Sequence, residues 1–188
     1  MNSKENPWQT KESKEVYNNP WIRVVENKVI NPKGGDGIYG VVHFKNVAIA
    51  IIPIDSDGYT YLVGQYRYTM NSYEWEVPMG GGLKENSNLE SAKRELLEET
   101  GIVAENWQII LNSQVSNSVS DEVSVSYVAT GLNYKKAMPE ETEQLIIKKV
   151  KVEEAINMAL EGEIRDLISI ASLLKLKIML ENNLILYK

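Results

Sequence analysis

Three glutamates lie close together in the stretch Arg94-Glu95-Leu96-Leu97-Glu98-Glu99. Carboxylates this close repel one another unless a cation lies among them. An α-helix turns by about 100° per residue, which places Glu95, Glu98 and Glu99 within an arc of roughly 100°. Carboxylate oxygens at positions i, i+3 and i+4 suit Mg²⁺ or Mn²⁺, and such a cation suits phosphate substrates because it neutralises their oxygens. The spacing therefore indicates a site for divalent metal and phosphate chemistry.

The residues around the glutamates predict a helix of about three turns. Ser87-Asn88-Leu89-Glu90 fits a capping box, and Gly101 stands where a left-handed C-cap is favoured. Leu89, Ala92 and Leu96 fall on the adjoining arc and are expected to pack against a sheet. The carboxylates should therefore line the edge of a buried face.

The alternative is a solvated acidic helix, in which Arg94 and Glu98 form an i,i+4 pair worth only a few tenths of a kcal/mol. Acidic residues in the last turn oppose the helix dipole, at a cost of roughly 0.3–1 kcal/mol each. The three carboxylates also share one face, and the glycines at 80–82 lead into the helix. These features favour the metal site.

Composition excludes several other kinds of chemistry. The 188 residues are 43% hydrophobic and 24% charged, as is ordinary for a globular domain, and the net charge of −6 argues against a nucleic-acid partner. The chain has no cysteine, and His43 is its only histidine, so thiol nucleophiles and multi-histidine metal sites are ruled out. His43 lies in a strand pattern, and we interpret it as structural.

No targeting or membrane segment is evident in the sequence. The N-terminal residues are polar and have no apolar signal core, and no apolar run reaches the roughly 18 residues that span a bilayer. We expect a cytoplasmic protein with no membrane partner.

The remaining patterns predict the elements that position the glutamates. The first dozen or so residues are expected to be loosely ordered, and the glycines that end Glu74–Gly82 to be flexible. A C-terminal helix is predicted from about Glu153 to Glu161. Strand patterns occupy Trp21–Ile30, Ile38–Phe44, Val47–Ile54, Tyr59–Tyr68, Trp107–Val115, Glu122–Leu132 and Glu143–Val152. This order predicts an α/β fold on a mixed sheet.

A last helix is predicted from near Asp166. Its apolar residues have helical spacing and are expected to form the buried stripe. They are Leu167, Ile170, Ala171, Leu174 and Ile178.

The glutamate segment resembles the signature of the Nudix hydrolases, G-x5-E-x7-R-E-U-x-E-E-x-G-U, where U is a bulky aliphatic residue. Here the pattern runs from Gly80 to Ile102, and every fixed position fits except Asn86, which stands where the family has glutamate. The resemblance implies the Nudix fold, an α/β/α sandwich on a mixed sheet. It also implies hydrolysis of a nucleoside diphosphate linked to another moiety.

The resemblance also implies roles for individual residues. Glu95, Glu98 and Glu99 match the family's ligands for Mg²⁺ or Mn²⁺, and Arg94 matches the arginine that orients a helix glutamate. Met79 matches a position whose backbone carbonyl can reach a metal.

The flanking sequence is similar to the ADP-ribose pyrophosphatase branch of the family. "QYR" ends at Arg67 and "WEVP" contains Glu76, and we assign both residues to substrate binding; a surface charge and a loop cap are the respective alternatives. Residues 1–45 resemble that branch's N-terminal β segment, here a hairpin or small sheet, which implies a homodimer. Residues 46–188 are then the Nudix domain.

The segment Pro139–Leu145 resembles the branch's acidic catalytic loop. The resemblance places the catalytic glutamate at Glu141, with Glu143 as its neighbour; a solvated loop is the alternative, and Glu98 is the candidate base if the loop has no role. The branch often has Ser-Pro-Gly where this chain has Ser116-Asn117-Ser118, so the second half of the substrate stays open.

The sequence therefore predicts Mg²⁺- or Mn²⁺-dependent hydrolysis of ADP-ribose to AMP and ribose 5-phosphate. The alternatives are a nucleoside diphosphate sugar, a dinucleoside polyphosphate, or a non-catalytic ADP-ribose sensor. The intact set Glu95, Glu98 and Glu99 argues against the sensor, which does not need all three ligands.

Overall fold

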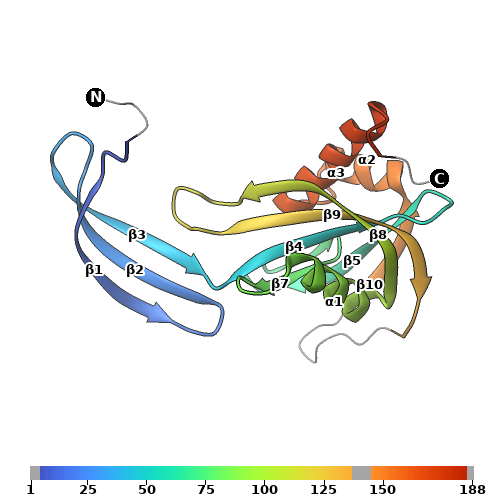
Figure 1. The fold of residues 1–188 in the computed structure, drawn as a ribbon, viewed down its shortest axis with the longest axis horizontal. Coiled ribbons are helices and arrows are strands. Elements are labelled where there is room, and N and C mark those ends of the chain that lie inside the picture. The colour runs from blue at the N-terminus through green and yellow to red at the C-terminus, as the bar shows by residue number, and fades with distance from the viewer. Residues whose placement is uncertain (1–4, 137–144, 186–188) are drawn as a thin grey trace. The chain divides into compact units, whose positions relative to one another are not determined.

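The computed structural model describes residues 5–136 and 145–185, which contain ten strands and three helices (Figure 1). In chain order they are β1 (Gln9–Asn18), β2 (Ile22–Ile30), β3 (Asp36–Phe44), β4 (Asn46–Pro53), β5 (Tyr59–Arg67), β6 (Ser72–Glu76), β7 (Met79–Leu83), α1 (Asn88–Thr100), β8 (Ile102–Gln114), β9 (Val123–Tyr134), β10 (Ile146–Lys151), α2 (Val152–Glu161) and α3 (Leu167–Glu181).

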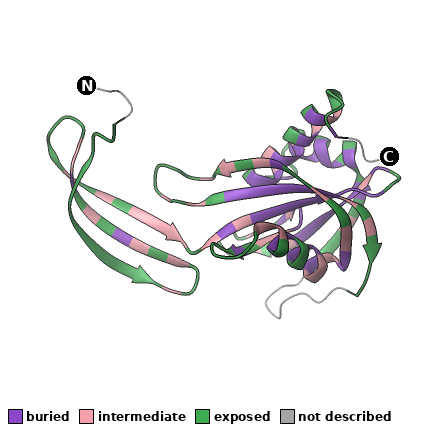
Figure 2. Cartoon of the chain, viewed as in Figure 1, coloured by how far each residue is buried: buried purple, intermediate pink, exposed green. Residues whose placement is uncertain are grey.

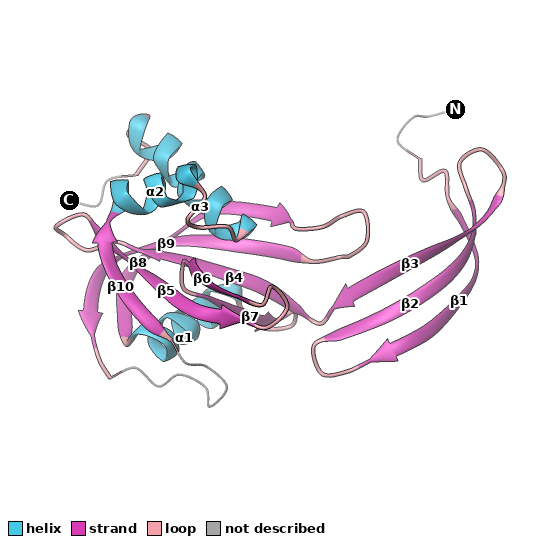
Figure 3. Ribbon diagram, turned by 180° about the vertical axis from the view of Figure 1, so that it is seen from behind, coloured by secondary structure: helices cyan, strands magenta, loops and turns pink. Residues whose placement is uncertain are grey.

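These strands form three sheets, with the orders β1-β2-β3, β10-β5-β6 and β7-β4-β9-β8. Strand β4 runs parallel to β9, whereas β5 is antiparallel to both β6 and β10. In the second unit, helix α1 lies on one side of the sheets β10-β5-β6 and β7-β4-β9-β8, and α2 and α3 lie on the other (Figures 1 and 3). The predicted α/β/α arrangement with mixed sheets is confirmed.

The chain divides into two compact units. The first consists of the described residues up to Asn46 together with Gln114–Glu122, and the second of the remainder. In the first unit, strands β1, β2 and β3 form an antiparallel sheet whose side chains are mostly exposed, with Val25 and Val29 buried (Figure 2).

The segment 114–122 is attached to β3 by side-chain hydrogen bonds. The Tyr39 hydroxyl donates to the Ser118 carbonyl at 2.8 Å. The Asp121 carboxylate accepts the Phe44 N–H at 2.8 Å and lies 2.8 Å from Nδ1 of His43. His43 therefore has a structural partner, in agreement with its interpretation from the sequence.

The expectation that the first dozen or so residues are loosely ordered is wrong from Gln9 onward, where β1 begins and pairs with β2. Every residue of β1 is exposed, so no apolar alternation marks it as a strand. Backbone pairing is supplemented by cross-strand ion pairs, Lys28–Glu12 at 2.8 Å and Lys11–Asp36 at 2.7 Å.

The core of the second unit surrounds β4 and β9. Ile49 and Ile51 are fully buried and belong to one cluster with Ala92 and Leu96 of α1. The opposite side faces α3, where the Ser172 hydroxyl donates to the Ser126 hydroxyl at 2.7 Å. Both faces of the β4 strand are thus covered, as its continuous apolar run predicts.

Two predictions about helices need correction. The capping box does not form, because Ser87 is the N-cap of α1 but makes no side-chain capping bond; Gly101 does adopt the left-handed C-cap. The predicted stripe of α3 is also wrong, since Leu167 and Ile178 are more than half exposed. The buried residues of α3 are Ile168, Ser169, Ser172, Leu173, Leu176 and Met179. The apolar residues of α3 lie on all sides of the helix, and two of its buried residues are serines, so its sequence gives no periodic signal that identifies the buried face.

Candidate active site

The glutamates of α1 lie at the boundary between core and solvent. Glu95 and Glu99 are buried and Glu98 is half-buried. Arg94 donates to Glu95 and to Glu98, each at 2.6 Å. Burial opposes the charged form of Arg94, but the two carboxylates outweigh it and raise the pKa of the guanidinium. In this structure Arg94 is thus a cation that makes the clustered carboxylates tolerable.

The glycines before the helix form a strand, β7, rather than the flexible segment that the sequence suggested. Strand β7 is hydrogen-bonded to β4 at the edge of its sheet. A Cβ atom at Gly80 would stand 2.1 Å from the carboxyl carbon of Glu95, so only glycine allows this carboxylate to lie against the strand. Arg94 also donates to the Gly81 carbonyl at 3.0 Å. The contacts of Arg94 and Glu95 with the glycines therefore hold α1 against β7.

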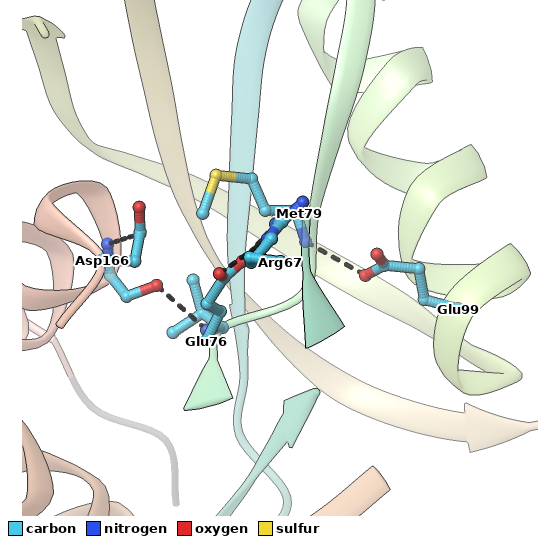
Figure 4. A network of polar contacts seen from close by, with 7 residues as sticks. Arg67, Glu76, Met79, Glu99 and Asp166 are labelled. Carbon is cyan, nitrogen blue, oxygen red and sulfur yellow. Dashed lines mark hydrogen bonds and ion pairs between the residues drawn. The ribbon is translucent and has the colours of Figure 1, made fainter. Parts of the chain in front are cut away.

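Met79 begins β7 and is bonded directly to α1. Its backbone N–H donates to the Glu99 carboxylate at 3.0 Å (Figure 4). The preceding residue, Pro78, accepts the Ile51 N–H at 2.9 Å, which attaches the same segment to β4. The structure thus places the backbone N–H of Met79 against one of the three glutamates, and the role of the Met79 carbonyl as a metal ligand stays a prediction.

Arg67 and Glu76 form an ion pair between β5 and β6 (Figure 4). Nε of Arg67 donates to Glu76 at 2.8 Å, and Nη2 donates to its second oxygen, so the contact is bidentate. The hydrogen bond to Glu76 is the main cause that raises the pKa of Arg67, with smaller contributions from Asp166 and Glu99. Glu76 is 4% exposed, which identifies it as the buried support of a half-exposed arginine.

Two contacts from the start of α3 were not foreseen from the sequence. The N–H of Val77 donates to the Ser169 hydroxyl at 3.1 Å, and Arg165 donates to the buried Glu74 at 3.0 Å through Nε. Asp166 caps α3 by accepting the Ser169 N–H at 2.7 Å. Val77 and Ser169, like Glu74 and Arg165, are about ninety residues apart in the chain, so no local sequence pattern could have predicted these two contacts.

The donor atoms fit a hard divalent cation in type, because carboxylate oxygens and a backbone carbonyl are the ligands that Mg²⁺ and Mn²⁺ prefer. Within residues 5–136 and 145–185, however, no three His, Cys, Asp or Glu side chains are grouped closely enough to hold a metal. The oxygens of Glu95 and Glu98 are directed at Arg94, and Glu99 accepts from Met79. A metal-bound arrangement therefore requires at least the Arg94 contacts to rearrange.

The remaining residues named from the sequence are Glu141, Glu143 and Asn86. Glu141 and Glu143 fall outside the described residues. Asn86 is exposed in a turn, where its N–H donates to the Leu83 carbonyl at 3.0 Å. A cavity of about 960 Å³ is lined by other residues of the second unit, among them Trp107 and Lys149.

Comparison with known proteins identifies the family of the chain. The NUDIX domain model matches residues 44–177, and the model of a nucleoside diphosphate sugar hydrolase N-terminal domain matches residues 8–42. The chain belongs to the Nudix family and is a Nudix hydrolase.

Individual relatives cover most of the chain. An ADP-ribose pyrophosphatase from Mycobacterium tuberculosis is 33% identical over 176 residues, covering 90% of this chain and 83% of the relative. A methanol dehydrogenase activator from Bacillus methanolicus is 27% identical over 159 residues, with coverage of 84% and 85%. The crystal structure of an ADP compounds hydrolase has a TM-score of 0.84 at 19% identity and covers 94% of this chain and 95% of its own, which shows a shared fold. The described residues include no helix that is long and apolar enough to cross a membrane.

Proposed function

We propose that the protein hydrolyses the pyrophosphate bond of ADP-ribose in the presence of Mg²⁺ or Mn²⁺ and releases AMP and ribose 5-phosphate. The observation that carries this proposal is the likeness over 90% of this chain to an ADP-ribose pyrophosphatase. This chain itself has the three signature glutamates Glu95, Glu98 and Glu99. Their position on one helix beside Met79 supports it.

In the proposed site, Glu95, Glu98, Glu99 and the Met79 carbonyl would hold the cation. A bound divalent cation supplies charge neutralisation on the phosphate oxygens and lowers the pKa of its water. Arg67, held in a bidentate contact by Glu76, would direct a fixed positive charge toward the diphosphate, because the guanidinium is always protonated at neutral pH.

In the reaction, the oxygen of one water molecule forms a bond to one phosphorus and the bond from that phosphorus to the bridging oxygen breaks. The bridging oxygen leaves on the other phosphate, and a carboxylate accepts the proton that the water loses. We assign that carboxylate to Glu141, with Glu143 as its neighbour.

A second candidate substrate is a nucleoside diphosphate sugar. The match of residues 8–42 to a nucleoside diphosphate sugar hydrolase N-terminal domain favours it. The two substrates share the diphosphate and differ in the group beyond it, so the same site residues would serve both.

The decisive experiment is a substrate panel with purified protein. ADP-ribose, ADP-glucose, UDP-glucose and diadenosine polyphosphates are incubated with Mg²⁺ or Mn²⁺, and released mononucleotide is measured by chromatography. We expect ADP-ribose to give the highest kcat/KM, with AMP formed in equal amount to ribose 5-phosphate. Activity should disappear with EDTA and return with added Mg²⁺. A preference of tenfold or more for a nucleotide sugar would transfer the assignment to the second candidate, and ADP-ribose binding without any product would indicate a sensor.

A further inference from the structure

Each residue from Glu76 to Met79 forms a hydrogen bond with a different element of the fold. Glu76 pairs with Arg67, Pro78 accepts from Ile51, and Met79 donates to Glu99. The remaining backbone donor is the N–H of Val77, since proline has none. That N–H is bonded to the hydroxyl of Ser169.

Ser169 is fixed on both sides. Its side chain is fully buried, and its own N–H donates to Asp166 at the N-cap of α3. Val77 is 1% exposed, so no solvent can replace the hydroxyl as the partner of its N–H. A second contact, between Arg165 and Glu74, attaches the same end of α3 to β6. Helix α3 thus supports the segment that precedes the glycines of β7.

We propose that Ser169 is a positioning residue of the active site. Its hydroxyl fixes the backbone at Val77 and thereby sets the position of Met79 relative to Glu99, two residues that we assign to the metal site. The inference rests on the proposed function for the role of Met79. Residues that support metal ligands from outside the ligand set typically change metal affinity or activity about 10–100-fold when they are replaced.

The chain offers a matched control for the loss of a buried hydroxyl. Ser172 lies one turn further along α3, is equally buried, and bonds to Ser126 and to the Ile168 carbonyl. Ser169→Ala and Ser172→Ala therefore remove the same group from the same helix. Only the first change leaves the N–H of Val77 without its partner.

The test compares the wild type with both variants in three measurements. These are the melting temperature, the Kd for Mn²⁺ from electron paramagnetic resonance without substrate, and kcat and KM for ADP-ribose. We expect both variants to melt at a lower temperature. Ser169→Ala alone should bind Mn²⁺ about tenfold more weakly and lose about tenfold in kcat, with KM changed less than twofold. Equal Mn²⁺ affinity and kcat in the two variants would overturn the proposal.

Two further variants keep the proposal testable. Ser169→Thr retains the hydroxyl and should bind Mn²⁺ as tightly as the wild type. Ser169→Cys offers only a weak acceptor to the Val77 N–H and should show the weaker Mn²⁺ binding expected of Ser169→Ala. The cysteine variant therefore replaces Ser169→Ala in the test if the alanine variant does not fold. If the wild type hydrolysed none of the panel, the proposed function would fail. The Mn²⁺ titrations would still decide the role of Ser169.

Discussion

The backbone N–H of Met79 donates to the carboxylate of Glu99 at 3.0 Å, and this bond joins the start of β7 to the last turn of α1. It holds a carboxylate that is 3% exposed at a fixed place beside the strand. Glu95 lies against Gly80, in space that a Cβ atom at that position would occupy. Strand β7 therefore determines where two of the three signature glutamates lie.

Glu99→Gln should lower kcat roughly a hundredfold or more at saturating Mg²⁺, because it removes one charged metal ligand. The amide oxygen can still accept the Met79 N–H, so the melting temperature should change little. Steady-state kinetics and thermal melts of the same preparations check both statements. Glu90→Gln is the control, since Glu90 is exposed on the first turn of α1 and forms an ion pair with Lys93 at 2.8 Å. Near-normal turnover in a folded Glu99→Gln protein would contradict the metal assignment.

Arg67→Lys should raise KM for ADP-ribose about tenfold, since a point charge cannot keep the bidentate contact to Glu76 and also face a phosphate. Glu76→Gln weakens the same ion pair from the other side while leaving the guanidinium in place. It should therefore raise KM much less. Equal effects of the two variants on KM would mean that Arg67 acts only through its structural pair.

Much of the helix site could be predicted because its determinants are local. The spacing of Glu95, Glu98 and Glu99 and the glycine at 101 fix a helix, its face and its end within one short segment. The pair Arg67 and Glu76 also lies within one hairpin, nine residues apart. Short-range periodicity and turn chemistry carry this information in the sequence itself.

The unpredicted features depend on tertiary contacts or lack a periodic signal. Ser169 meets Val77 across 92 residues, and a serine in an apolar helix looks like any other small residue until the fold places it. Strand β1 has no buried side chain and so no alternation. The glycines of β7 suggested a flexible segment. Glycine is needed at position 80 because Glu95 approaches the backbone closely there, and this contact cannot be seen in the sequence.

We propose that the N-terminal unit forms a homodimer. Its sheet buries few side chains, and Trp21 and Ile38 are 66% and 69% exposed, so an apolar partner surface would stabilise it. Sedimentation velocity at micromolar concentration should show a dimer, and deletion of residues 1–45 should give a monomer. Ile38→Glu should weaken the dimer without removing the sheet. A compact wild-type monomer, or unchanged assembly after the deletion, would refute the proposal.

The last prediction concerns the general base. The carboxylates of α1 make poor proton acceptors if they are committed to metal, so a further acidic group is required from elsewhere in the chain. Glu141 is the residue that the family resemblance assigns to this role. Glu141→Gln should lower kcat by roughly 10²–10⁴, the range for loss of a general base, with a modest change in KM.

Neighbouring glutamates provide the controls for this assignment. Glu143→Gln should cost less than Glu141→Gln, and Glu140→Gln should have little effect, because neither is matched to the catalytic position. The pH dependence of kcat/KM distinguishes a base from a residue that only binds substrate, since the acidic limb of the profile should be lost in Glu141→Gln. If Glu141→Gln and Glu143→Gln both keep normal kcat, the base must be sought on α1. Glu98 is then the first residue to replace, because it is the most exposed of the three glutamates there and its carboxylate is paired with Arg94 on the surface of the helix.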